Sequence, residues 1–100
     1  MLIISGYMYI DPSVLEQFMG ELNLLANAVR QRDGNLSYNA AVEDYQTGSL
    51  LISERWVDQD ALNAHLIKTD TVEFINRWQG KTKGELFKYD ACNERGLMDG

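Results

Sequence analysis

The hydrophobic period of the chain changes early, from that of a strand to that of a helix. Residues Met1–Ile10 are mostly aliphatic or aromatic, and the run stops at Asp11-Pro12, which is typical of a β-strand. Apolar residues then recur in steps of three and four as far as about Gln31, the spacing of one stripe on an α-helix. This stripe consists of Leu15, Phe18, Leu22, Leu25 and Val29. A strand followed by a helix of similar length predicts a helix lying along a sheet.

Two further strands are predicted in the middle of the chain. Leu36–Tyr45 and Ser49–Val57 are rich in aliphatic and aromatic residues, and Gln46-Thr47-Gly48 between them has the composition of a hairpin turn. The second of these strands, like Met1–Ile10, carries apolar residues on both faces. The face expected to be apolar in the first of them consists of Leu36, Tyr38, Ala40 and Val42.

The second half of the chain predicts a helix in two pieces. Asp58 or Asp60 is in position to cap the first piece. The spacing of Asp70 and Glu73 is that of a capping box, so the helix is expected to break near Thr69 and to resume. The remaining segments are a basic loop over residues 81–84, a last strand over Glu85–Cys92 and a tail over residues 93–100.

The order of these elements predicts the fold class. A β-α-β-β-α-β order is that of the ferredoxin-like α+β fold, in which one antiparallel sheet carries both helices on one face. No linker or repeat divides the chain, so residues 1–92 are expected to form a single domain. Because two strands are apolar on both faces and helices cover only one, we expect a homodimer in which two sheets pack together.

Composition excludes several classes of function. Fifteen acidic against nine basic residues give a net charge of −6, and an acidic surface repels nucleic acid and anionic membranes, so neither is an expected partner. One histidine and one cysteine are too few for a zinc site or a disulfide framework, and no glycine-rich phosphate-binding motif occurs. The absence of a signal-like segment favours a cytoplasmic location. An enzyme of this composition is expected to work without a cofactor or metal.

Two short motifs follow one another from the third predicted strand into the second helix. They are Glu54-x-Trp56 and Ala61-Leu62-x-Ala64-His65, and together they resemble the antibiotic biosynthesis monooxygenase (ABM) family. The likeness extends upstream to Gly34 and Tyr38 and downstream to Phe74. It implies a dimeric α+β barrel with a ligand pocket between the helices and the sheet of each subunit. It also implies oxidation of a small aromatic hydroquinone or polyketide-like phenol by dioxygen, with no metal, flavin or other prosthetic group.

The resemblance points to particular site residues. His65 is the expected catalytic residue, either as proton acceptor or as hydrogen-bond partner of the substrate oxygen, since a histidine titrates near neutral pH. The expected substrate-binding residues are Trp56, Tyr38, Phe74 and Trp78 as aromatic walls and Gly6 as a source of space. Each of these residues also has a simpler interpretation as part of the core.

Two other functions remain open from the sequence. The same pocket in a non-enzymatic dimer would bind a small apolar metabolite without consuming oxygen. A purely structural or stress-associated dimer would fill the pocket with its own side chains. Because one fold carries many functions, the architecture alone favours none of the three.

Overall fold

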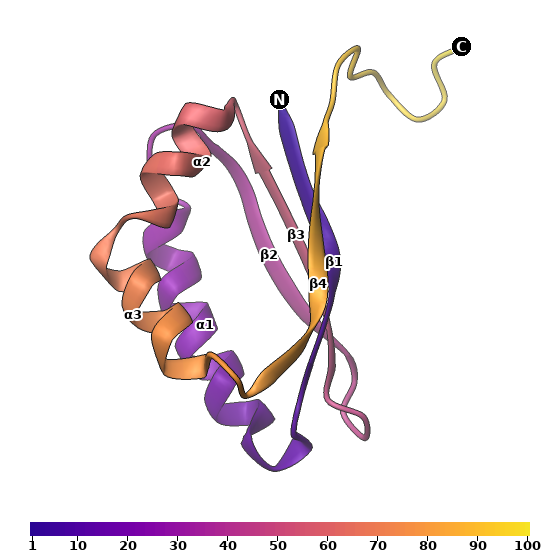
Figure 1. Ribbon diagram of the computed structural model, residues 1–100. Coiled ribbons are helices and arrows are strands. Elements are labelled where there is room, and N and C mark those ends of the chain that lie inside the picture. Colours follow the sequence, from indigo (N-terminus) through magenta and orange to yellow (C-terminus); the bar gives the residue numbers. More distant parts are fainter.

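The computed structural model describes residues 1–100 as one four-stranded sheet with helices on one side (Figure 1). The expected α+β ferredoxin-like arrangement is confirmed, with the second helix in two pieces. The elements in chain order are β1 Leu2–Ile10, a 3₁₀ turn Pro12–Val14, α1 Leu15–Val29, β2 Asn35–Asp44, β3 Ser49–Trp56, α2 Gln59–Leu66, α3 Thr69–Trp78 and β4 Thr82–Asp90.

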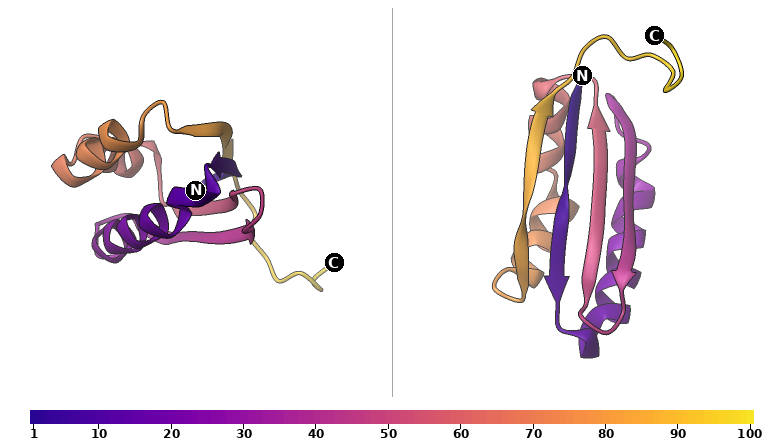
Figure 2. Two further views of the ribbon diagram at one scale, coloured as in Figure 1. Left: turned by 90° about the horizontal axis from the view of Figure 1, so that it is seen from below. Right: turned by 90° about the vertical axis from the view of Figure 1, so that its right-hand side faces the viewer.

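All neighbouring strands are antiparallel, in the order β2-β3-β1-β4. The right-hand panel of Figure 2 shows the four strands in front of the helices, so one face of the sheet is left open. The register brings Tyr38, Glu54, Ile4 and Lys88 into one row across all four strands. Residues paired across a sheet point to the same face. Because Ile4 and Tyr38 are buried, the side chains of this row point toward the helices.

The core lies between α1 and this covered face. All five members of the predicted stripe, from Leu15 to Val29, are buried. On the sheet side, Leu50 and Trp56 of β3 are fully buried. Asp11 caps the 3₁₀ turn that leads into α1: its carboxylate accepts the backbone N–H of Ser13, and Pro12 occupies the first helical position.

Several boundaries differ from the sequence-based prediction. Of the two candidate caps, Asp58 is the one that caps α2, by accepting the backbone N–H of Ala61. The break between α2 and α3 is confirmed, but α3 begins at Thr69 after an N-cap residue, Lys68, whose side chain makes no capping bond. Asp70 instead contacts Arg32 and the backbone N–H of Thr71. The last strand begins at Thr82, so the predicted basic loop is mostly strand. A bulge between Asn35 and Ser37 takes Leu36 out of its row and leaves it 47% exposed.

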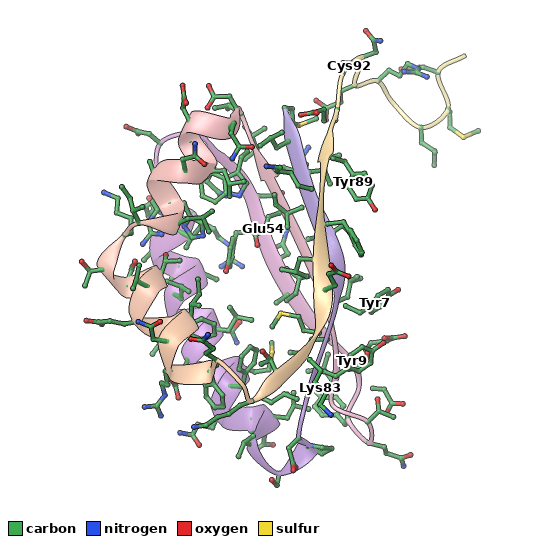
Figure 3. The ribbon with its side chains drawn as sticks, viewed as in Figure 1. Tyr7, Tyr9, Glu54, Lys83, Tyr89 and Cys92 are labelled. Carbon is green, nitrogen blue, oxygen red and sulfur yellow. The ribbon has the colours of Figure 1, made fainter.

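The open face of the sheet carries a group of exposed aromatic side chains. In Figure 3, Tyr7, Tyr9 and Tyr89 point away from the helices, whereas Glu54 lies between the sheet and the helices. Tyr7 is 46% exposed and Tyr89 is 55% exposed. We call this group, with Phe87 and Leu51 from the same face, the aromatic face. None of the helices is both long and apolar enough to cross a lipid bilayer.

Candidate active site

A pocket of about 370 Å³ lies between the helices and the covered face of the sheet. Its lining comes from every helix and every strand, so it depends on the whole fold. The lining is mostly aliphatic and aromatic, and only four of its members are polar or charged residues: Glu54, His65, Thr71 and Lys88. An apolar cavity with a few fixed polar groups is typical of a site for a small organic molecule.

His65 of α2 is held between two aromatic rings. Its imidazole stacks on the Trp56 indole, with 4.7 Å between ring centroids, and the Tyr38 ring lies edge-on at 5.9 Å. The residue is only 4% exposed. These contacts fix the plane of the imidazole against the wall of the pocket.

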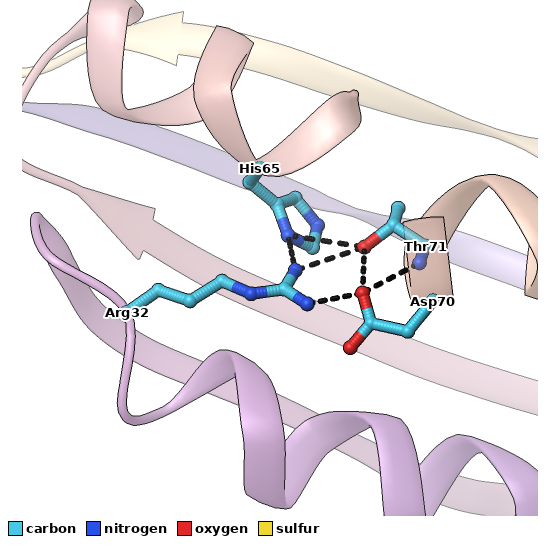
Figure 4. Close-up of polar contacts among 4 residues, drawn as sticks. All are labelled: Arg32, His65, Asp70 and Thr71. Carbon is cyan, nitrogen blue, oxygen red and sulfur yellow. Dashed lines mark hydrogen bonds and ion pairs between the residues drawn. The ribbon is translucent and has the colours of Figure 1, made fainter. Parts of the chain in front are cut away.

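The polar side of His65 is held by Arg32, which follows α1 (Figure 4). The Arg32 guanidinium donates to His65 Nδ1 at 2.6 Å and to Thr71 Oγ1 at 2.9 Å. Its other terminal nitrogen forms a salt bridge with Asp70, whose carboxylate also accepts the backbone N–H of Thr71. Three helical segments are therefore tied together at one edge of the pocket.

The contact with Arg32 decides the protonation state of His65. A guanidinium can only donate, so Nδ1 must accept, and the hydrogen of the neutral ring sits on Nε2. Burial and the positive charge of Arg32 lower the pKa of His65 to about 4, with a smaller opposing effect of Asp70. At neutral pH the imidazole is an uncharged hydrogen-bond donor through Nε2, with its Nδ1 lone pair already used.

Glu54 is a buried carboxylate in the same pocket. It is 7% exposed and accepts one hydrogen bond, from the Trp56 indole N–H to Oε1 at 3.0 Å. It takes part in none of the three salt bridges of the structure. Burial raises the pKa of Glu54, and the bond from Trp56 opposes that rise only in part.

The structure brings three of the expected site residues together in the pocket. Tyr38, His65 and Phe74 all line it. Burial, with a further contribution from the charge of Glu54, raises the pKa of Tyr38, so its hydroxyl stays protonated. Phe74 of α3 lies with its ring centroid 5.4 Å from that of Phe18, another lining residue.

The other three expected residues lie outside the lining. Trp56 is behind His65 and contacts the pocket only through that ring and through Glu54. Trp78 lies edge-on to Phe18 at 5.0 Å and donates to Glu21, which joins α3 to α1. At Gly6 a side chain would collide with the backbone oxygen of Glu85, so this glycine allows β4 to approach β1 and adds no space to the pocket.

Sequence reasoning missed most of the polar groups around the pocket. Glu54 was not among the expected site residues, although residues two apart on a strand share a face and the Glu54-x-Trp56 spacing places Glu54 on the same face as Trp56. Lys88 lies on the covered face for the same reason, because side chains alternate between the two faces along β4 and Lys88 pairs with Ile4. No local signal links Arg32 to His65, because they are far apart in the sequence. No three His, Cys, Asp or Glu side chains gather in a group that could hold a metal ion.

Fold and pocket together define a class: small α+β domains that enclose one apolar ligand site between their helices and their sheet. The model of the family named antibiotic biosynthesis monooxygenase matches residues 1–77. The chain belongs to this family.

Individual relatives agree with this assignment. "Putative monooxygenase YcnE" from Bacillus subtilis is 25% identical over 65 residues, which are 65% of this chain and 68% of that protein. A crystal structure of a putative antibiotic biosynthesis monooxygenase from Deinococcus radiodurans superposes with a TM-score of 0.87 at 25% identity, covering 99% of this chain and all of the other. SnoaB from Streptomyces nogalater, described as a cofactor-independent oxygenase, shares the fold with a TM-score of 0.76 at 14% identity, over 98% of this chain and 97% of its own.

Proposed function

We propose that this protein is a monooxygenase that oxidises a small aromatic hydroquinone or polyketide-like phenol with dioxygen and without metal or flavin. The observation that supports this most is an apolar pocket lined by a buried carboxylate, Glu54, and a neutral histidine, His65, each of which is held by a contact with Trp56. Membership of the family supplies the reaction class.

A hydroquinone can supply all the electrons that the reaction needs. Insertion of one oxygen atom into a ring C–H bond and oxidation of the ring to the quinone remove four electrons in total. Dioxygen accepts these four electrons, one of its atoms enters the product and the other leaves as water. The protein has to favour the phenolate, which is the form that passes an electron to dioxygen, and to exclude bulk water.

His65 is the group that we propose to stabilise this phenolate. Its Nε2 carries a hydrogen at neutral pH, because Arg32 occupies Nδ1. A hydrogen bond donated to an oxyanion favours the charged form of the substrate. Of the two roles expected for His65, hydrogen-bond partner therefore fits its contacts better than proton acceptor.

The aromatic residues have different roles in this proposal. Tyr38 and Phe74 contact the flat substrate directly, since both line the pocket. Trp56 acts through His65 and Glu54, which it contacts, and Trp78 acts through Phe18. Gly6 contributes only through the packing of β4 on β1.

We also propose that the working form is a homodimer. The aromatic face is open in the single chain and sits opposite the helices (Figure 3). A contiguous group of exposed aromatic side chains on a sheet is typical of a protein interface. We propose that the aromatic face of a second copy packs against it, since a two-fold symmetric dimer brings the same surface of both copies together.

Oxygen uptake with a panel of hydroquinones tests the function. We expect catalytic uptake with at least one member, and a fall in kcat/KM of about a hundredfold in His65→Ala, the range of a lost oxyanion donor. Lys68→Ala, at an exposed residue beyond α2, is the matched control and should behave as the parent. Saturable binding with no uptake for any member would favour a non-enzymatic binding domain instead.

A further inference from the structure

Glu54 is the acidic side chain that lines the pocket, and its position is set by the sheet register. It lies on β3, one of the two inner strands of the sheet, in the row formed by Tyr38, Glu54, Ile4 and Lys88. Figure 3 shows it between sheet and helices, away from the aromatic face. A carboxylate in such an apolar place is unfavourable for stability unless it is compensated.

The compensation is incomplete. The Trp56 indole satisfies Oε1, and no other protein group donates to this carboxylate. No arginine, lysine or histidine forms a salt bridge with it. The second oxygen therefore has no protein donor, while the residue borders the pocket. A hydroxyl group on a bound ligand is a donor that would complete this site.

The other groups around the pocket cannot accept a proton as readily. His65 has no free lone pair, because Nδ1 accepts from Arg32 and Nε2 carries the hydrogen. Tyr38 is held in its protonated form, and Lys88 is a cation bound to Gln59. Thr71 is a weak base that accepts from Arg32. The α1 residues in the lining are apolar.

We infer that the Glu54 carboxylate accepts the hydrogen bond of the substrate hydroxyl and takes its proton as the phenolate forms. This inference rests on the proposed function. The substrate O–H bond breaks, an O–H bond forms on Glu54, and the electron pair stays on the substrate oxygen, where the Nε2–H of His65 stabilises it. The proton leaves Glu54 for the reduced oxygen atom that departs as water.

The position of Glu54 also restricts the substrate. The hydroxyl that is deprotonated must lie at the Glu54 end of the pocket, beside His65 and Tyr38. A methyl ether at this position has no hydrogen to donate, and a carboxylate there would meet a like charge. Neutral phenols and hydroquinones are therefore the substrate class, and their methyl ethers and benzoate analogues are not.

Anaerobic binding tests the inference without any turnover. Naphthol and its methyl ether have nearly the same apolar body and differ in one donor. We expect the parent to bind naphthol about tenfold more tightly than the ether, the effect of a hydrogen bond to a charged acceptor. Glu54→Gln should lose this preference, because its single oxygen stays with Trp56 and its amide nitrogen, a donor, faces the pocket.

Two further variants keep this result interpretable. Glu54→Asp retains a carboxylate and should retain part of the preference. Glu16→Gln makes the same chemical change at an exposed position in the first turn of α1 and should leave the preference intact. An equal affinity of the parent for naphthol and the ether, or an unchanged preference in Glu54→Gln, would overturn the inference.

Turnover separates this inference from the proposed function. With a hydroquinone that the parent oxidises, Glu54→Gln should lower kcat/KM at least a hundredfold, the size of a lost general base. The parent rate should rise with pH as Glu54 ionises, and this rise should be absent in Glu54→Gln. The charged or titratable groups around the pocket besides Glu54 are Tyr38, His65 with Arg32 behind it, and Lys88. Burial raises the pKa of Tyr38 and lowers that of His65, so His65 is the group whose titration in acid the Glu54→Gln comparison has to separate from that of Glu54.

The possible failures are therefore distinct. If no hydroquinone is oxidised, the proposed function is wrong, and the naphthol comparison still decides whether Glu54 accepts a ligand hydroxyl. If hydroquinones are oxidised and Glu54→Gln keeps the parent rate and pH profile, the function stands and the role of Glu54 is wrong. His65→Gln serves as the reference variant. It should reduce the rate of oxidation but should keep the increase of that rate with pH that is due to ionisation of Glu54.

Discussion

The two faces of the sheet are built from the same strands but differ in what covers them. On the covered face, Glu54 and its row neighbour Tyr38 are buried between the sheet and the helices. One residue along, the row on the open face contains Ser53 and Ser5 and ends in Phe87, which is 51% exposed. Polar residues occur in both rows, so polarity alone does not identify the site.

The difference lies in solvent access. Burial raises the pKa of Glu54, which makes its carboxylate a stronger proton acceptor, and lowers that of His65, which keeps the imidazole neutral. The same side chains on the open face would be ordinary solvated groups. The open face instead offers flat aromatic area, which suits another protein surface. One face is therefore suited to chemistry and the other to association, and single substitutions can separate these two properties.

The largest effect is expected from truncating an aromatic side chain on the covered face. Trp56→Ala removes a fully buried ring that stacks on His65 and donates to Glu54. We expect the free energy of unfolding to fall by about 3 to 5 kcal/mol. Urea denaturation measures it. Tyr89→Ala on the open face is the matched aromatic truncation, and a loss of equal size there in the dissociated single chain would contradict the distinction between the faces.

The next effect concerns association and should arise only on the open face. Tyr7→Glu places a charge in the middle of the aromatic face, where two copies would bring like charges together. We expect the parent to have twice the chain mass of 11.4 kDa and this variant to have the chain mass. Sedimentation equilibrium measures both. Leu24→Glu, at a side chain of α1 that is 73% exposed, should remain dimeric.

These comparisons also show where the sequence was sufficient. The helix stripe ending at Val29 and the break between α2 and α3 follow from hydrophobic period and capping, which are local properties. The start of β4 at Thr82 was hidden because Lys83 and Gly84 have the composition of a loop, and only the pairing with β1 makes them strand. Neighbours along the chain therefore determine the helix stripe and the break between α2 and α3, whereas partners across the sheet determine where β4 begins.

The site was predictable to a smaller extent. His65 and Tyr38 were predicted as site residues from the family resemblance, and the structure places both in the lining of the pocket. The hydrogen bond of Arg32 to His65 depends on how the end of α1 meets α2 in space, which no local pattern encodes. Trp78 was expected at the substrate because it is aromatic, but its N–H bonds to Glu21 and its ring fills the interface of α1 and α3.

A smaller effect is expected from the pH dependence of stability. The pKa of His65 is about 4 in the folded protein and near 6.5 when unfolded, so the unfolded state binds the proton first as pH falls. The stability due to neutral His65 is present above pH 6.5 and is lost toward pH 4. Between pH 7 and pH 5 this amounts to about 2 kcal/mol. In urea denaturation at the two pH values, an equal loss in His65→Gln would contradict this assignment.

The smallest effect is a gain of stability from removing the buried charge. Burial raises the pKa of Glu54 above its ordinary value, so its ionisation costs stability as the pH rises above that value. Glu54→Gln should therefore be more stable than the parent at pH 7, by about 1 kcal/mol, and the gain should disappear in acid. Thermal unfolding at the two pH values measures this. Lower stability of Glu54→Gln at pH 7 would mean that the carboxylate is better compensated than its contacts indicate.

The proposed function requires that a phenolic ring bound against the covered face receives one oxygen atom from dioxygen. The direct measurement is turnover of the best hydroquinone under oxygen-18 gas, with early quenching and mass spectrometry of the product. We predict one labelled oxygen atom in the quinone product and the other in water, and loss of this labelled product in Glu54→Gln. An unlabelled quinone formed together with hydrogen peroxide would contradict the proposed monooxygenase function, because dioxygen would then have served only as an electron acceptor.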